Sequence, residues 1–239
     1  MRSYYFGMNR FLGCFFGCMV WLGFSQENPS SSFVDVNYFK GNIPLHNPDI
    51  LHLIKGHPEG IILGWSHRTN GKKEWQQRYN YPDYGASFMY QDLKNDVLGN
   101  TLGFYGHFNF YFLKRRLMLR VGQGIVVASN PYDKNSNPKN IAFGSKLLGS
   151  PYLMLNYKKP NLLGPIGLQT GLVFFHASNG SFKSPNTSVN TISLNIGLNY
   201  DLDTKEVVYE EPIEYSAVFK TFKYNFVLRS GVNQTDVVG

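Results

Sequence analysis

The sequence predicts an all-β protein, an antiparallel transmembrane β-barrel of about eight strands. Two observations favour this fold class. Aromatic residues make up 16% of the 239 residues and stand beside 24 glycines, while the mean hydropathy of −0.25 is close to neutral. Several segments of about ten residues also alternate between apolar and polar side chains. That is the pattern of strands with one face toward lipid and the other toward a polar lumen.

The segment Thr101 to Leu113 shows the alternation most clearly. One face carries apolar side chains and the other mostly polar ones: Leu102, Phe104, Phe108, Phe110 and Phe112 against Tyr105, His107, Asn109 and Tyr111. The charged turn 114–116 follows, and then a second alternating run begins at Leu117. Each run is long enough to cross a bilayer as a tilted strand, which takes about 9–11 residues.

The same reasoning gives a provisional set of eight strands without an internal repeat or a domain linker. They are residues 60–68, 84–92, 101–113, 117–129, 152–157, 167–177, 190–200 and 222–231.

The connections between these strands predict an orientation. Short turns at 114–116 and 158–165 fall at one end, and polar loops at 130–150 and 177–189 fall at the other. In bacterial barrels the short turns face the periplasm and the long loops face outward. The connection 201–216 is long for a periplasmic turn, and the chain ends without an aromatic strand. Because an open barrel would leave unpaired backbone groups in lipid, either the eight strands close or the barrel is truncated from a longer one; truncation is slightly favoured.

The N-terminus predicts a signal peptide over residues 1–25, followed by a barrel domain over 26–239. Arg2 and Arg10 precede an apolar run, Phe11 to Phe24, and small residues stand before Gln26. A membrane anchor is the alternative, but a spanning helix needs about 18 or more apolar residues. Export followed by barrel formation implies the bacterial outer membrane.

Both cysteines, Cys14 and Cys18, lie inside the predicted signal peptide. The mature chain would therefore have no disulfide, no cysteine nucleophile and no thiolate metal site. Loss of Arg2 and Arg10 lowers the formal charge from +7 to +5. A mildly basic chain suits an anionic lipid surface, although solubility alone would account for it.

The stretch "FFHASNGSFKSPNTSVN", Phe174 to Asn190, carries the candidate chemistry. His176 and Ser178 are two residues apart, so they share one side of a strand. That side also carries Phe174 and is predicted to face lipid. On the returning strand Asn190 lies at the end of an apolar, lipid-facing stripe. A polar cluster that faces lipid at the rim of a barrel suits an enzyme that acts on a membrane lipid.

These residues resemble the lipid A 3-O-deacylase family (PagL-type, also described as acyloxyacyl hydrolases). The resemblance rests on H-x-S-N-G, then P-N, then an Asn-to-Tyr strand, over residues 166–200. It implies an outer-membrane hydrolase that removes an ester-linked acyl chain from lipid A in lipopolysaccharide, without a metal or organic cofactor. Ser178 would be the nucleophile and His176 its base. Asn179 and Asn186 match positions that stabilise the oxyanion, and Gly180 would let the backbone approach closely.

The sequence departs from the family at the acid. The family's glutamate falls fourteen residues after the histidine, and this chain has Asn190 there. An amide can orient an imidazole but cannot offset its positive charge. In serine proteases, the exchange of the acid for its amide lowers turnover by about 10⁴. A distant acid such as Glu214 could substitute, although no sequence pattern favours it.

Other interpretations stay open. The motif could be only a polar hairpin loop with His176 in an aromatic girdle, and the protein could be a non-catalytic structural or transport barrel. Arg68, Lys72, Lys73 and Arg78 could meet lipid A phosphates, but a solvated loop is favoured. The spacing of His46, His52 and His57 is not that of a metal site. The sequence has no phosphate loop, no G-x-S-x-G elbow and no basic helix for nucleic acid. It does not define the preferred acyl chain or the oligomeric state.

Overall fold

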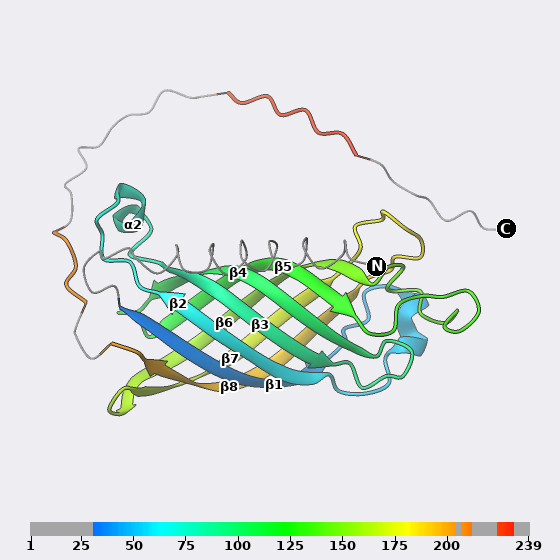
Figure 1. Ribbon diagram of the computed structural model, residues 1–239, viewed down its shortest axis with the longest axis horizontal. Helices are drawn as coiled ribbons and strands as arrows, with labels where there is room; N and C mark the ends of the chain where they lie inside the picture. The colour runs from blue at the N-terminus through cyan, green and yellow to red at the C-terminus, as the bar shows by residue number, and fades with distance from the viewer. Residues whose placement is uncertain (1–30, 204–206, 212–223, 232–239) are drawn as a thin grey trace, which may run out of the picture. The chain divides into compact units, whose positions relative to one another are not determined.

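The computed structural model describes residues 31–203, 207–211 and 224–231, and it contains a closed antiparallel barrel of eight strands (Figure 1). The elements in chain order are β1 (Ser32–Asn42), the 3₁₀ helix η1 (Pro48–Leu53), β2 (Glu59–His67), the short helix α2 (Glu74–Arg78), β3 (Asp83–Asp92), β4 (Asn100–Phe112), β5 (Leu117–Ala128), β6 (Leu147–Leu163), β7 (Ile166–Ala177) and β8 (Val189–Asp201). Each strand pairs with its sequence neighbours, and β1 pairs with β8. The predicted fold class is confirmed.

Closure decides between the two possibilities that the sequence left open. Ten residues of β1 pair with β8, from Phe33 opposite Asp201 to Asn42 opposite Ile192. No strand of the described barrel therefore has an unpaired edge in lipid. The expectation of a barrel truncated from a longer one is wrong, because eight strands suffice to close the sheet.

One observed strand was missing from the predicted set, and one predicted strand is not found in the structure. The first strand, β1, was missed because Phe33 and Phe39 face the lumen. Their apolar side chains blur the alternation of Val34, Val36 and Tyr38 with polar residues. The predicted strand 222–231 is wrong for its described part, since residues 224–231 are not in a strand. Among the described residues no strand follows β8, which ends at Asp201, so the described part of 201–216 does not join two strands.

The two ends of the barrel differ in their connections, as Figure 1 shows. We call one the loop end; it carries residues 43–58, 93–99, 129–146 and 178–188. The other is the turn end, with residues 68–82, 113–116 and 164–165. Strand β6 extends well beyond the predicted 152–157, so the connection from β6 to β7 shortens to two residues. Among the described helices, none is long and apolar enough to span a membrane.

Side chains alternate between an apolar outer face and a lumen that holds many polar groups. In β4 the outward side chains Leu102, Phe104 and Phe108 are exposed, while His107 and Asn109 are buried. The buried Arg120 donates to both carboxylate oxygens of Asp35, at 2.6 and 3.1 Å, and to Asn109 Oδ1 at 2.7 Å. These bonds matter because a buried charge is tolerated only when it is paired.

Candidate active site

His176 and Asn190 are cross-strand partners at the loop end of the barrel. His176 is the next-to-last residue of β7, Asn190 is the second residue of β8, and the two are register partners. Both side chains point to the outer face, in line with Phe174 and Ile192, whereas their neighbours Phe175 and Val189 are buried in the lumen. The structure therefore brings together the two residues that the sequence placed fourteen positions apart.

A hydrogen bond of 2.6 Å joins His176 Nδ1 to Asn190 Oδ1. An amide oxygen can only accept, so in this arrangement Nδ1 carries the proton. The other ring nitrogen, Nε2, then keeps a free lone pair, and this is the tautomer that a general base requires. The amide of Asn190 thus orients the ring as an acid would, but it contributes no negative charge.

Ser178 lies just beyond the end of β7, where its backbone extends the sheet by one bridge. Its N–H donates to Gly149 O at 3.1 Å, and Gly149 N–H donates to Ser178 O at 2.7 Å. The Ser178 hydroxyl donates to Asn186 Oδ1 at 3.1 Å and accepts from Gly180 N–H at 3.0 Å. No hydrogen bond joins the described side chains of His176 and Ser178.

The residues expected around an oxyanion lie beside this hydroxyl. The N–H of Asn179 donates to Asn186 Oδ1 at 3.1 Å, so this oxygen is shared with Ser178. The side chain of Asn179 is buried, and its Nδ2 donates to Lys183 O at 2.6 Å. The backbone N–H groups of Asn179 and Gly180 therefore lie next to the serine hydroxyl. The side chain of Asn179 stabilises the loop through its bond to Lys183 O.

The backbone conformation of Gly180 gives a reason for glycine at this position within the protein itself. A Cβ on Gly180 would meet only the Phe182 ring, at an ordinary 3.6 Å, so close approach is not the constraint. Its φ of +62° lies in the left-handed region, which glycine adopts without strain. That conformation turns the Gly180 N–H toward Ser178 Oγ. The expected close approach of the backbone to a substrate oxyanion at this position stays a prediction.

The comparison with models of protein families shows to which family this chain belongs. The model of the family described as "Lipid A 3-O-deacylase (PagL)" matches residues 59–199, which is more than half of the sequence. The chain belongs to this family. The matched residues run from β2 to β8 and include His176, Ser178 and Asn190.

Three of the solved structures to which this chain is similar are the following. The crystal structure of the outer membrane enzyme PagL has 17% identity and a TM-score of 0.47, over 68% of this chain and 97% of that one. Neisserial surface protein A has 10% identity and a TM-score of 0.42, over 71% and 96%. Ail from Yersinia pestis has 13% identity and a TM-score of 0.38, over 72% and 99%. The search of curated proteins found no match.

In this PagL-family chain, neighbouring loops hold the segment 178–188 in place. A Cβ on Gly144 would lie 2.3 Å from Pro185 O, so only glycine lets the loop 129–146 pack this closely. Thr187 donates through N and Oγ1 to Ile141 O, both at 3.1 Å, and His46 Nε2 donates to Thr187 O at 3.1 Å. Sequence reasoning missed Gly144 and His46 in this role, because no local signal marks contacts between distant loops.

Other expected candidates lie away from this pair. The basic residues Lys72, Lys73 and Arg78 stand on or beside α2 at the turn end, opposite His176, so they cannot meet a lipid bound there. His46 and His52 contact backbone carbonyls, and His57 contacts Asn42. Among the described residues, no group of His, Cys, Asp or Glu could hold a metal ion. Glu214 and the predicted signal peptide lie outside the described residues.

Proposed function

We propose that this PagL-family protein hydrolyses the ester-linked acyl chain at position 3 of lipid A, with Ser178 as nucleophile and His176 as base. The observation that carries the proposal is the 2.6 Å bond from His176 Nδ1 to Asn190 Oδ1 on the outer face. It leaves Nε2 free to take a proton at the level where a lipid headgroup meets the barrel. If the loop end faces outward, as in other barrels, the substrate is in the outer leaflet.

The proposed reaction has two steps. The Ser178 hydroxyl adds to the ester carbonyl while its proton passes to His176 Nε2, and this proton then goes to the leaving sugar oxygen. An acyl-serine remains after the carbon–oxygen bond of the ester breaks. Water then adds to the acyl-serine with His176 again as base, which releases the fatty acid and restores the serine.

The hydrogen bonds around Ser178 describe a resting arrangement that substrate would have to change. The hydroxyl donates to Asn186 Oδ1, and the same oxygen accepts from Asn179 N–H. A substrate carbonyl oxygen in the place of Asn186 Oδ1 would accept a hydrogen bond from the N–H of Asn179. A rotation of the Asn186 amide would add its NH₂ as a second donor. Donors aimed at the developing oxyanion are often the largest single contribution to acyl-transfer catalysis.

A non-catalytic barrel is the alternative from a different class. An unpaired His176 would favour it, and an acid beside His176 would favour the enzyme. The structure has neither, since His176 is paired with an amide. This pairing supports the enzyme over the alternative, because it selects the basic tautomer.

The test is hydrolysis by the purified protein in detergent micelles that contain lipid A, with release of 3-O-linked fatty acid measured by mass spectrometry. We expect release by the parent and none above background by Ser178→Ala or His176→Ala. Thr170→Ala, which removes a lipid-facing hydroxyl on the same strand but away from the pair, is the matched control and should stay active. Equal release by the parent and Ser178→Ala would refute the assignment.

A further inference from the structure

The positive charge of the loop end is concentrated in the two loops that hold the candidate site. The loops 129–146 and 178–188 together contain one acid and four lysines: Asp133, Lys134, Lys139, Lys146 and Lys183. Each of the other two loops at this end, 43–58 and 93–99, contains one aspartate and one lysine. The loops beside Ser178 therefore carry a formal positive charge, whereas those of the other two loops cancel.

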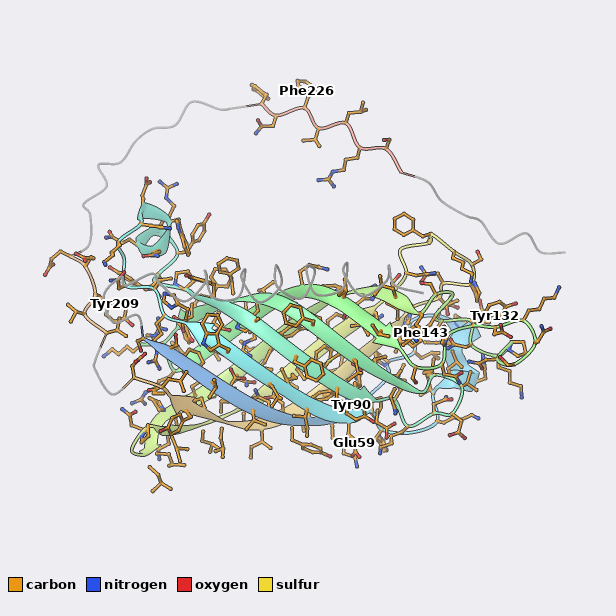
Figure 2. All side chains as sticks on the ribbon, in the orientation of Figure 1. Glu59, Tyr90, Tyr132, Phe143, Tyr209 and Phe226 are labelled. Carbon is orange, nitrogen blue, oxygen red and sulfur yellow. The ribbon has the colours of Figure 1, made fainter. Side chains whose placement is uncertain are left out.

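The two basic loops form one structural unit. Thr187 donates through N and Oγ1 to Ile141 O, both at 3.1 Å, and so joins one loop to the other. The loop 129–146 is also fixed internally, since the buried side chain of Asn140 accepts from Phe143 N–H at 3.0 Å. Figure 2 shows Phe143 at the loop end of the barrel. Charges on such loops are positioned before a ligand binds, which lowers the entropic cost of binding.

Three of the lysines are fixed by their backbone and expose their side chains. Lys183 O accepts from the side chain of Asn179 at 2.6 Å, and Lys146 O accepts from the N–H of the last residue of β5 at 2.8 Å. Lys139 O contacts His52 Nε2 at 2.9 Å. All three lysine side chains are exposed. We call these three residues the lysine surface.

The lysine surface has no ion-pair partner in the described part of the chain. Other lysines at the same end are paired: Lys40 and Lys94 both contact Glu59, at 3.2 and 2.9 Å. The ammonium groups of the lysine surface therefore keep their charge for an anionic ligand, with which charged hydrogen bonds are stronger than neutral ones.

Asp133, the one acid of the two loops, is bonded within its own turn. Its Oδ1 accepts from the N–H groups of Asn135 and Ser136, at 2.9 and 2.8 Å, and from the Ser136 hydroxyl at 3.0 Å. The hydrogen bonds from Ser136 and Asn135 lower the pKa of Asp133, and the charge of Lys183 lowers it further. Lys183 therefore lies near the loop 129–146, so the cations of both loops share one face of the molecule.

The place of the lysine surface indicates its ligand. Lys183 follows Ser178 by five residues in the same loop, and Lys146 precedes Gly149, the backbone partner of Ser178, by three. A lipid whose ester reaches Ser178 from the outer face lays its headgroup against these loops. Lysine binds phosphate as a point charge. The phosphate groups of an anionic lipid headgroup therefore complement this surface.

We propose that Lys139, Lys146 and Lys183 bind the phosphate groups of the lipid headgroup and thereby position the ester at Ser178. The inference rests on the proposed function, because it takes lipid A as the substrate. It adds that the site selects a phosphorylated glycolipid over the same lipid without phosphate. The three lysines are positioning residues, since they act on the headgroup and leave the proton transfer to His176.

The test measures the dissociation constant of lipid A for the Ser178→Ala protein in detergent micelles, by native mass spectrometry, so that no turnover occurs. One lysine near an anionic surface contributes about fivefold in affinity. Lys183→Gln should therefore weaken binding about fivefold, and substitution of all three lysines by glutamine should weaken it on the order of 100-fold. Lys72→Gln with Lys73→Gln removes charge at the turn end and should leave the affinity unchanged. Lipid A without its phosphates should bind equally to every variant, which also shows that each is folded.

The active chain separates this inference from the proposed reaction. With Ser178 present, the triple lysine variant should have a raised KM and an unchanged kcat, because the lost charge acts equally on substrate and transition state. The lysine surface is overturned if the triple variant binds phosphorylated lipid A as tightly as the turn-end control, or if it loses affinity equally for phosphate-free lipid A. If the parent releases no fatty acid but the lysine variants still lose phosphate-dependent binding, the reaction fails and the lysine surface stands.

Discussion

The substitution Asn190→Asp tests the position at which the resemblance to the family places an acid. Aspartate has the shape of asparagine, so its carboxylate can keep the 2.6 Å contact with His176 Nδ1. It differs in two respects. It carries a negative charge beside the imidazolium that forms during the reaction, and it cannot turn an NH₂ group toward Nδ1. We expect Asn190→Asp to raise kcat without changing the fold.

The size of the increase follows from the geometry. With a contact of 2.6 Å, the centres of the two charges lie about 4 Å apart. Their attraction is then about 1 kcal/mol in bulk water and about 4 kcal/mol at an effective dielectric constant of 20. Both side chains are half-buried at the rim, so an intermediate value of about 2 kcal/mol applies. This corresponds to roughly 30-fold in kcat. An aspartate also cannot present an NH₂ group to Nδ1, and this should raise kcat further. The total increase should stay below the factor of about 10⁴ known from serine proteases.

The assay is the initial rate of fatty acid release from lipid A in micelles, measured over a range of lipid A concentrations so that kcat and KM separate. KM should change little, because Asn190 contacts His176 rather than the substrate. Asn190→Ala is the matched control: it removes the acceptor, and we expect a lower kcat than in the parent. An unchanged or reduced kcat in Asn190→Asp, or an Asn190→Ala variant as active as the parent, would refute the orienting role.

Three further substitutions probe the site and its support. Asn186→Asp keeps the acceptor for Ser178 but removes the NH₂ donor, so kcat should fall about 10²–10³-fold with the barrel intact by circular dichroism. Gly144→Ala places a methyl group 2.3 Å from Pro185 O; activity should fall by up to about 100-fold, while the urea midpoint of the barrel stays unchanged. Asp35→Ala leaves the buried Arg120 without its ion-pair partner and should lower the free energy of unfolding by about 3–5 kcal/mol. The double substitution Asp35→Leu with Arg120→Met should recover much of this stability.

The strands that were predicted well from sequence are those with the strongest contrast between their faces. In β4, large apolar residues alternate with polar ones over nearly the whole strand, and its predicted bounds differ from the observed ones by one residue. In β1 the lumen also receives Phe33 and Phe39, so the alternation does not reveal which face is which. Residues 222–231 have an alternating pattern, but their described part is not a strand. Alternation predicts an amphipathic extended segment, but membership of a barrel also requires a neighbouring strand with a free edge.

The candidate site shows the same division between local and long-range information. The expectation that His176 and Ser178 share one side follows from their spacing, and the hairpin register brings Asn190 opposite His176. The 3.1 Å bond from Ser178 to Asn186 and the close approach of Gly144 to Pro185 depend on how two loops fold against each other. Their ends are set by strands far apart in the sequence, so no local pattern encodes them.

The most direct test of the central claim is the mass of lipid A from Gram-negative cells that express the parent, Ser178→Ala or Asn190→Asp. We predict that the parent removes one ester-linked acyl chain from position 3, that Asn190→Asp removes it more completely, and that Ser178→Ala leaves it in place. Lipid A that keeps this chain in all three strains, with each protein folded in the outer membrane, would contradict the account.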